Sequence, residues 1–251
     1  MAPPSSPESA RSRRPRRRRW LTAIVLVAVA GSATAILLAA GTFEVDRVDF
    51  GGLHRVSYDE ASEAAGIDPG DFMGTLDVRG AERSLEDLPW IAHARIRRHW
   101  PASVSVDIVE RTAAAIALSA PQEWVLIDIE GRVLTSALSV LPELPRLSGI
   151  AAAPRPGRFL ASDAGALLAV VDAARGQPEF EVAALWRDQR GDIRARVRQL
   201  PGDRQIEVAL GDESAIGAKT AAIAAVIGGL ERSEAVLDVS VPHLPVLRST
   251  G

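Results

Sequence analysis

The sequence offers few residues that could carry out chemistry, and none is spaced for it. Histidine is the usual proton carrier near neutral pH and a common metal ligand. The chain has four histidines: His54, His93, His99 and His243. None belongs to an HExxH motif, which would place two metal ligands on one helical face. We interpret these side chains as solvated or hydrogen-bonded, and we expect no metal and no cofactor.

Nucleophiles and phosphate-binding loops are equally scarce. The chain has no cysteine, which excludes disulfides, thiolate zinc sites and a cysteine nucleophile. No GxSxG elbow or SxxK pair is present, and the single lysine, Lys219, is expected on the outer face of its helix. The glycines match neither a Walker loop nor a dinucleotide fingerprint. We therefore expect no enzyme and no small-molecule substrate, although triads built from distant residues leave no such motif.

The charge distribution separates the N-terminus from the rest of the chain. Residues 1–19 carry seven arginines and one glutamate, whereas the remaining residues carry 22 basic and 31 acidic side chains. Residues 20–43 contain no charged residue and would form a helix of about 36 Å, enough to cross a bilayer core of about 30 Å. The preceding arginines predict a cytoplasmic N-terminus and an extracytoplasmic C-terminal region. We predict a disordered basic cytoplasmic tail over 1–19 and a single transmembrane helix over 20–43.

Two other interpretations of this region exist. A cleaved signal peptide would use residues 33–35, Ala-Thr-Ala, as its small-residue cleavage site, and residues 17–21, RRRWL, resemble a twin-arginine signal. The apolar run is longer than a usual signal-peptide core, which favours an uncleaved anchor. Arginines beside a membrane span serve orientation, and no aromatic residues interleave them, so we expect no nucleic-acid partner.

Hydrophobic periodicity divides the exported region near residue 112. Residues 44–111 read as strand, helix, helix, strand and strand. Ser57, followed three residues later by Glu60, predicts the start of the first helix. Asp77 predicts the start of the second helix.

The last two strands of this region form a predicted hairpin. Apolar and polar residues alternate over 94–97 and again over 104–108, with a turn at Trp100 and Pro101. The hairpin carries a basic group on its surface: Arg95, Arg97, Arg98 and His99. Solvation of a hairpin tip explains this group, and a docking point for another protein is the alternative.

Residues 112–247 have many short strand patterns and two helical ones. One helix opens at Ser162, and the other has Ile216, Ile223 and Ile227 on one face. A last strand over 236–241 alternates apolar and polar side chains before Pro242 and Pro245 end any ladder. Residues 248–251 form a short tail. The fold class is α+β, with a small β-α-α-β-β domain followed by a mixed β-sheet domain with two helices.

The order of these features resembles the FtsQ/DivIB family of bacterial cell division proteins. The resemblance covers roughly residues 12–247, and the run from 88 to 111 is its most specific part. The landmarks are Val45 and Val48, Gly52, Val56-Ser57, Gly66-Ile67, Gly70, Leu76-Asp77, Leu88-Pro89-Trp90, Ala94, Arg97, Trp100-Pro101, Glu110-Arg111, Asp128, Gly131 and the segment AVLDVSVP. One departure is that members usually carry proline shortly after the Glu-Arg pair, where this chain has Thr112-Ala113-Ala114.

The resemblance implies a POTRA domain over 44–111 and an FtsQ-type β domain over 112–247. It implies a non-enzymatic, single-pass scaffold of the divisome, in the cell membrane at the division septum. Its implied partners are FtsL-like and FtsB(DivIC)-like proteins and the septal peptidoglycan synthase complex. The last strand is the implied partner site, because an extended partner segment can add to an exposed sheet edge through main-chain hydrogen bonds. Its candidate residues are Val236, Leu237, Asp238, Val239, Ser240 and Val241.

Two alternatives belong to other classes of protein. A POTRA-containing protein-transport or assembly component is the first, but such proteins usually carry several POTRA repeats and only one is found here. An anchored, exported enzyme with an unrecognised site is the second.

Overall fold

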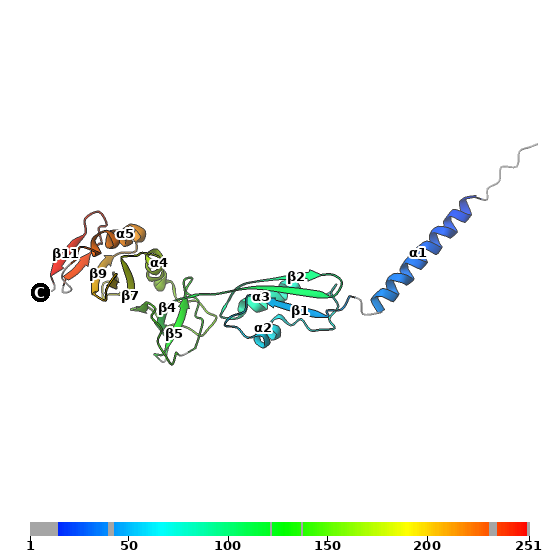
Figure 1. The fold of residues 1–251 in the computed structure, drawn as a ribbon, viewed down its shortest axis with the longest axis horizontal. Helices are drawn as coiled ribbons and strands as arrows, with labels where there is room; N and C mark the ends of the chain where they lie inside the picture. The colour runs from blue at the N-terminus through cyan, green and yellow to red at the C-terminus, as the bar shows by residue number, and fades with distance from the viewer. Residues whose placement is uncertain (1–14, 40–42, 121, 137, 231–234, 250–251) are drawn as a thin grey trace, which may run out of the picture.

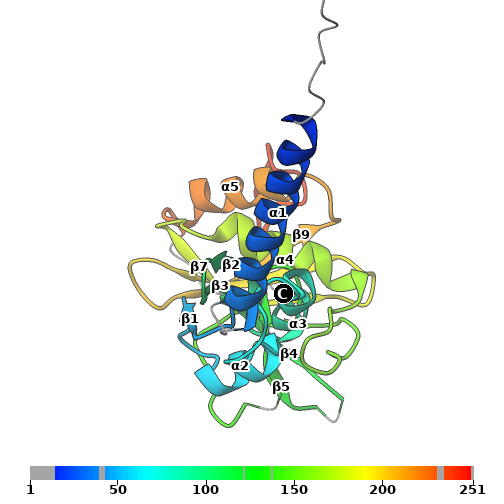
Figure 2. The same cartoon turned by 90° about the vertical axis from the view of Figure 1, so that its right-hand side faces the viewer.

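The computed structural model describes residues 15–39, 43–120, 122–136, 138–230 and 235–249. Three parts follow one another along the long axis (Figure 1): helix α1 (Pro15–Ala39), a first module of residues 43–111 and a second module of residues 112–249. Figure 2 views the molecule from the α1 end, with α1 in front of both modules. The expected disordered tail, residues 1–19, lies mostly outside the described residues, and residues 15–19 belong to α1 instead.

The side chains of residues 20–36 in α1 are exposed. Trp20 and Val27 are each 72% exposed, and Ile36 is 68% exposed. Within the part of the chain that the structure describes, no helix combines the length and the apolar character needed to cross a membrane.

The first module has the predicted order of elements. Its strands and helices are β1 (Arg47–Gly51), α2 (Tyr58–Ala65), α3 (Val78–Asp87), β2 (Ile91–His99) and β3 (Ser103–Glu110). The sheet order is β1-β3-β2, with β1 parallel and β2 antiparallel to β3. The two helices bury Ala61 and Leu85 against the sheet, where Ile91, Val104 and Val106 are also fully buried.

Local hydrogen bonds explain where the two helices begin and end. The Ser57 hydroxyl accepts a bond of 3.2 Å from the Glu60 N–H, and the Asp77 carboxylate accepts one of 2.9 Å from the Gly80 N–H. Both caps satisfy N–H groups that a first helical turn leaves without partners. Gly66 ends α2 at a φ of 57°, a conformation that glycine adopts without a Cβ clash. The predicted helix starts are therefore confirmed.

The second module is built on one mixed sheet of eight strands. Its strands are β4 (Ala113–Leu118), β5 (Trp124–Asp128), β6 (Arg146–Ser148), β7 (Phe180–Arg187), β8 (Ile193–Gln199), β9 (Gln205–Gly211), β10 (Ala235–Asp238) and β11 (Val246–Ser249). The sheet order is β11-β10-β9-β8-β7-β6-β4-β5. The helical elements are η1 (Ser162–Ala164), α4 (Gly165–Ala174) and α5 (Ile216–Ile227). The predicted α+β class with a mixed sheet and two helices is confirmed.

One face of this sheet forms the core. Leu147, Leu185, Ala195 and Val208 are in register across β6 to β9 and are fully buried. They share one apolar cluster with residues of α4 and α5, so the helices cover this face. Because side chains alternate along a strand, the intervening residues point to the opposite face.

Lys219 is a correction within this module. The sequence predicts it on the outer face of α5, but its side chain is only 1% exposed. Its Nζ donates a bond of 2.7 Å to the Asp212 carboxylate and one of 2.9 Å to the Asp212 carbonyl. A lysine can be buried when a carboxylate and a carbonyl accept hydrogen bonds from its ammonium group.

Candidate partner-binding site

The histidines are distributed over both modules. His54 follows β1, His93 and His99 lie on β2, and His243 follows β10. His99 Nε2 lies 2.9 Å from Ser105 Oγ, and His93 Nδ1 lies 3.8 Å from a Glu86 carboxylate oxygen. Among residues 15–39, 43–120, 122–136, 138–230 and 235–249, no cluster of three or more His, Cys, Asp or Glu side chains could hold a metal ion.

The C-terminal segment differs from the sequence prediction. Residues 236–241 are expected to form the edge of the sheet, but β10 lies between two strands of its own chain. Leu237 pairs with Val208 of β9 on one side and with Leu247 of β11 on the other. The prediction of an edge at 236–241 is therefore wrong. The sequence predicts that Pro242 and Pro245 end the sheet. In the structure they lie in the connection between β10 and β11, where no ladder hydrogen bond is needed from them, and pairing resumes in β11.

The six candidate residues consequently have different environments. Leu237, Asp238 and Val239 are buried, Val236 is half-buried, and Ser240 and Val241 are exposed. The Val239 N–H donates a bond of 2.9 Å to the Ala209 carbonyl. Much of this segment therefore supports the sheet of its own chain.

β11 is one of the two edge strands of the sheet, and β5 is the other. The sheet order gives β11 one neighbour, β10, and an edge strand directs about half of its backbone groups away from that neighbour. Val246 and Leu247 are 45% and 44% exposed, and the preceding Leu244 is 65% exposed. This strand is hard to predict from the sequence, because a four-residue stretch after proline is too short to show alternation.

An ion pair fixes β11 to β10. Arg248 lies 2.7 Å from the Asp238 carboxylate, which also accepts bonds from the N–H and hydroxyl of Ser240. Burial alone would raise the pKa of Asp238, but the Ser240 hydrogen bonds and the charge of Arg248 hold that pKa below its usual value. A polar hollow beside this pair is lined by Asp188, Arg190, Arg194, Asp238, Ser240 and Arg248, among others.

The structure separates the basic residues of the β2–β3 hairpin. Arg95, Arg97 and His99 are exposed on one face of β2, and Arg97 forms an ion pair of 2.9 Å with Asp107. Arg98 points to the other face and is half-buried, where its guanidinium donates to the Leu76 carbonyl. The four candidates therefore do not form one continuous surface.

The outer edge of β2 is occupied by side chains of α3. The Glu86 carboxylate accepts a bond of 3.2 Å from the Ala94 N–H, and the Glu82 carboxylate accepts one of 2.9 Å from the Ile96 N–H. Sequence reasoning missed these contacts, since they depend on how α3 lies along the strand. They cover donors through which another strand could pair with β2.

A second group of contacts that the sequence did not predict joins the two modules. Arg111 lies 2.6 Å from Asp128 and 2.7 Å from Glu130. Arg132 donates bonds of 2.9 Å to the carbonyls of both Glu86 and Asp87. The only earlier signal was that Arg111 and Asp128 are landmarks of the family resemblance.

Glu110 has a similar role within the first module. Its carboxylate accepts hydrogen bonds of 2.9 to 3.0 Å from the N–H groups of His54, Arg55 and Val56. Burial would raise the pKa of Glu110, but these backbone bonds hold the pKa below its usual value. Glu110 thus holds the loop between β1 and α2.

Comparison with known proteins agrees with this architecture. Residues 43–111 match the family model described as POTRA domain, FtsQ-type. Cell division protein FtsQ of Myxococcus fulvus is 35% identical over 94 residues, which are 38% of this chain and 32% of that protein. FtsQ of Streptomyces coelicolor is 30% identical over 158 residues, 59% of this chain and 60% of that protein. FtsQ of Zymomonas mobilis is 26% identical over 214 residues, 81% of this chain and 61% of that protein.

The chain spans less than two thirds of the length of each of these relatives, from 32% to 61%. The family model and the three relatives all carry the name FtsQ, and the family model covers the whole first module. Residues 43–111 are therefore a POTRA domain of the FtsQ type, and the chain is similar to bacterial cell division proteins named FtsQ.

Proposed function

We propose that this chain is a scaffold of the bacterial divisome, which binds FtsB(DivIC)-like and FtsL-like proteins and links them to septal wall synthesis. The partner segment adds as a strand to β11. The observation that carries this proposal is the position of β11 at one edge of an eight-stranded sheet, with Val246 and Leu247 exposed. Main-chain hydrogen bonds would supply affinity, and the exposed aliphatic side chains would give the added strand an apolar face to cover.

We further propose that residues 20–43 anchor the chain in the cell membrane at the septum. Their support is the charge-free sequence, which extends beyond the end of α1 at Ala39, and the seven arginines that precede it. These arginines favour a cytoplasmic N-terminus, with both modules on the extracytoplasmic side. The domain limits predicted from the sequence, 44–111 and 112–247, leave part of β11 in the predicted tail over 248–251, so we extend the second module to residue 249.

The test uses the tagged full chain in dividing cells and proline substitutions in β11. Successive N–H groups of a strand point to opposite sides, so one of Val246→Pro and Leu247→Pro removes a donor that faces the partner. We expect the amount of FtsB-like and FtsL-like protein that co-purifies with that variant to fall at least about tenfold. The matched control, Leu247→Val, keeps the N–H and favours a strand, so it should retain capture.

Circular dichroism and thermal unfolding of the same variants distinguish lost binding from lost folding. If both proline variants fold and capture these partners as well as the unsubstituted chain does, strand addition at β11 is excluded. Failure of the anchor is a separate result: the chain would be released from membranes by alkaline carbonate while still binding its partners.

A further inference from the structure

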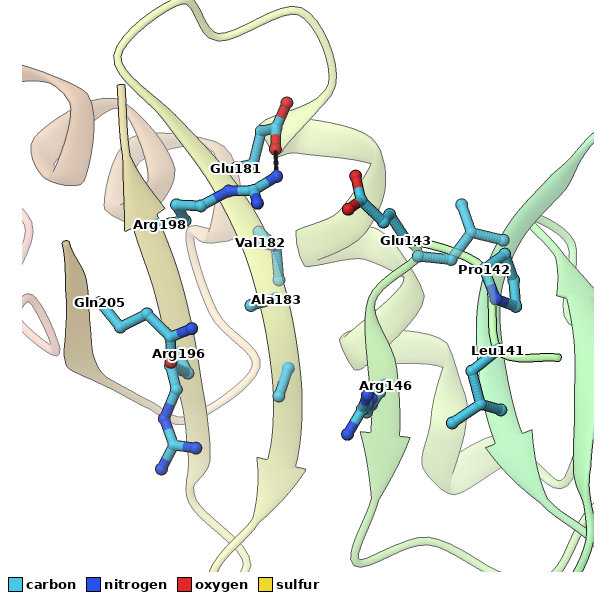
Figure 3. Close-up of a pocket in the computed structure, with 12 residues that line it drawn as sticks. Leu141, Pro142, Glu143, Arg146, Glu181, Val182, Ala183, Arg196, Arg198 and Gln205 are labelled. Atoms are coloured by element: carbon cyan, nitrogen blue, oxygen red, sulfur yellow. Dashed lines mark hydrogen bonds and ion pairs between the residues drawn. The ribbon is translucent and has the colours of Figure 1, made fainter. Parts of the chain in front are cut away.

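The sheet face opposite α4 and α5 carries a row of side chains in register. Arg146 of β6 pairs with Ala184 of β7, and Ala184 pairs with Arg196 of β8. The two arginines therefore stand on either side of an alanine, about 10 Å apart at their Cα atoms, since neighbouring strands are about 4.8 Å apart. Figure 3 shows Arg146 and Arg196 on the two strands that flank β7.

These two arginines differ from the other arginines of this face. Arg194 lies 3.0 Å from Glu207. Arg198 of β8 forms an ion pair with Glu181 of β7, and Figure 3 shows this pair. Over the described residues, neither Arg146 nor Arg196 has a carboxylate within 4.0 Å. Glu207 is the cross-strand neighbour of Arg196, but its carboxylate is directed to Arg194.

Tryptophan rings hold both of these guanidinium groups. Arg146 lies over the Trp124 ring at 6.0 Å from its centroid, and Arg196 lies over the Trp186 ring at 5.8 Å. Contact between a cation and an aromatic face restricts an otherwise mobile side chain without neutralising its charge. Each arginine is therefore oriented and keeps its hydrogen-bond donors for another group.

A pocket of about 350 Å³ lies between them. Val182, Ala183 and Ala184 of β7 line it, together with Arg146, Arg196 and Leu141. Leu141 is 40% exposed, and the adjacent Val140 is 79% exposed. The site thus combines two unpaired cations with an aliphatic rim.

We propose that this pocket binds an acidic, aliphatic segment of a partner polypeptide. A side-chain carboxylate of the partner would lie between Arg146 and Arg196, where each guanidinium can donate charge-assisted hydrogen bonds to it. An aliphatic side chain of the same segment would cover Leu141 and Val140. The site goes beyond strand addition at β11, because β7 is separated from β11 by three strands of the sheet.

Charge favours a peptide over a polyanion as the occupant. Glu143, Glu181 and Arg198 also line the pocket, so three arginines face two glutamates and the net charge is only slightly positive. A phosphate-rich ligand would approach these carboxylates as well as the arginines. A single carboxylate flanked by aliphatic groups matches both the charge and the exposed leucine and valine.

The direct test measures binding of a peptide probe to the full chain in detergent micelles. The probe is a fluorescein-labelled 12-residue peptide of alternating glutamate and leucine, and fluorescence anisotropy reports its binding. We expect Arg146→Ala/Arg196→Ala to weaken binding at least about tenfold. The matched control, Arg155→Ala/Arg158→Ala, removes two exposed arginines of another loop and should leave binding unchanged.

Charge exchange and alternative probes complete the test. The Arg146→Glu/Arg196→Glu variant should instead bind a lysine–leucine peptide of the same length. Equal binding of a glutamine–leucine peptide, or stronger competition by inorganic phosphate or phosphatidylglycerol vesicles than by the acidic peptide, would overturn the proposal. The β11 proline variants should bind the acidic probe normally, so failure of this site and failure of strand addition give different results.

Discussion

The Nη2 of Arg132 in the second module lies 2.9 Å from the carbonyl oxygen of Asp87, the last residue of α3 in the first module. A second bond of 2.9 Å reaches the Glu86 carbonyl. Carbonyl groups at a helix C-terminus lack helical N–H partners and favour a cation. The Arg132 guanidinium also lies 5.7 Å from the centre of the Phe159 ring. One buried side chain therefore connects a helix end of the first module to the segment between β5 and β6 of the second.

Replacing this arginine should loosen the junction between the modules. We expect Arg132→Ala to lower the free energy of unfolding by about 2 kcal/mol, since two carbonyls lose a charged donor. The distance between labels on α3 and β7 should also become broader, as measured by electron–electron double resonance. The absence of native cysteine makes two introduced cysteines unique labelling sites.

Arg155→Ala is the control for the loss of one arginine, because Arg155 is exposed. A distance distribution as narrow in Arg132→Ala as in the control would show that Arg132 does not fix the junction.

The features that could be predicted are those that depend on residues close together in the sequence. Ser57 and Asp77 cap helices within three residues of themselves, and the order β-α-α-β-β follows from periodicity. The contact of Arg132 with Asp87 joins residues 45 positions apart, and no local pattern contains it. The edge at β11 was missed for a related reason, since the position of a strand in a sheet depends on all its neighbours.

The carboxylates of Glu82 and Glu86 should protect the outer edge of β2. In Glu82→Ala/Glu86→Ala, the N–H groups of Ala94 and Ile96 lose their acceptors, at a cost of about 1 kcal/mol each. Amide hydrogen exchange at these two residues should become at least about fivefold faster. Sedimentation velocity should also detect association through the uncovered edge.

Glu63→Ala is the matched control, because Glu63 is exposed on α2 and α2 is not part of this edge. Unchanged exchange at Ala94 and Ile96 in the double variant would mean that the glutamates do not protect the strand.

The pair of Asp212 and Lys219 should contribute to stability in acid. The hydrogen bond from Lys219, followed by those from Ser214, lowers the pKa of Asp212 from 3.8 to about 2. A carboxyl whose pKa is lower in the folded state stabilises the fold above its unfolded pKa, and this contribution disappears as pH falls through the folded pKa. The difference in stability between the unsubstituted chain and Asp212→Asn should therefore shrink between about pH 4 and pH 2.

Denaturant unfolding at several pH values measures this difference. Asp172→Asn, an exposed substitution on α4, is the matched control for the loss of one carboxylate. A constant difference for Asp212→Asn would instead contradict the role of Lys219 as its partner.

Proline at Val239 should act on folding before it acts on partner binding. If residues 236–241 formed the sheet edge, Val239→Pro would weaken capture and leave the module folded. The structure instead places the Val239 N–H 2.9 Å from the Ala209 carbonyl, and the Val239 side chain is fully buried. Proline removes this donor and strains the strand, so we expect a loss of about 3 kcal/mol in the free energy of unfolding, measured in urea.

Val239→Thr keeps the N–H and should cost less. A Val239→Pro variant that unfolds like the unsubstituted chain but fails to capture FtsB-like protein would return the binding site to 236–241.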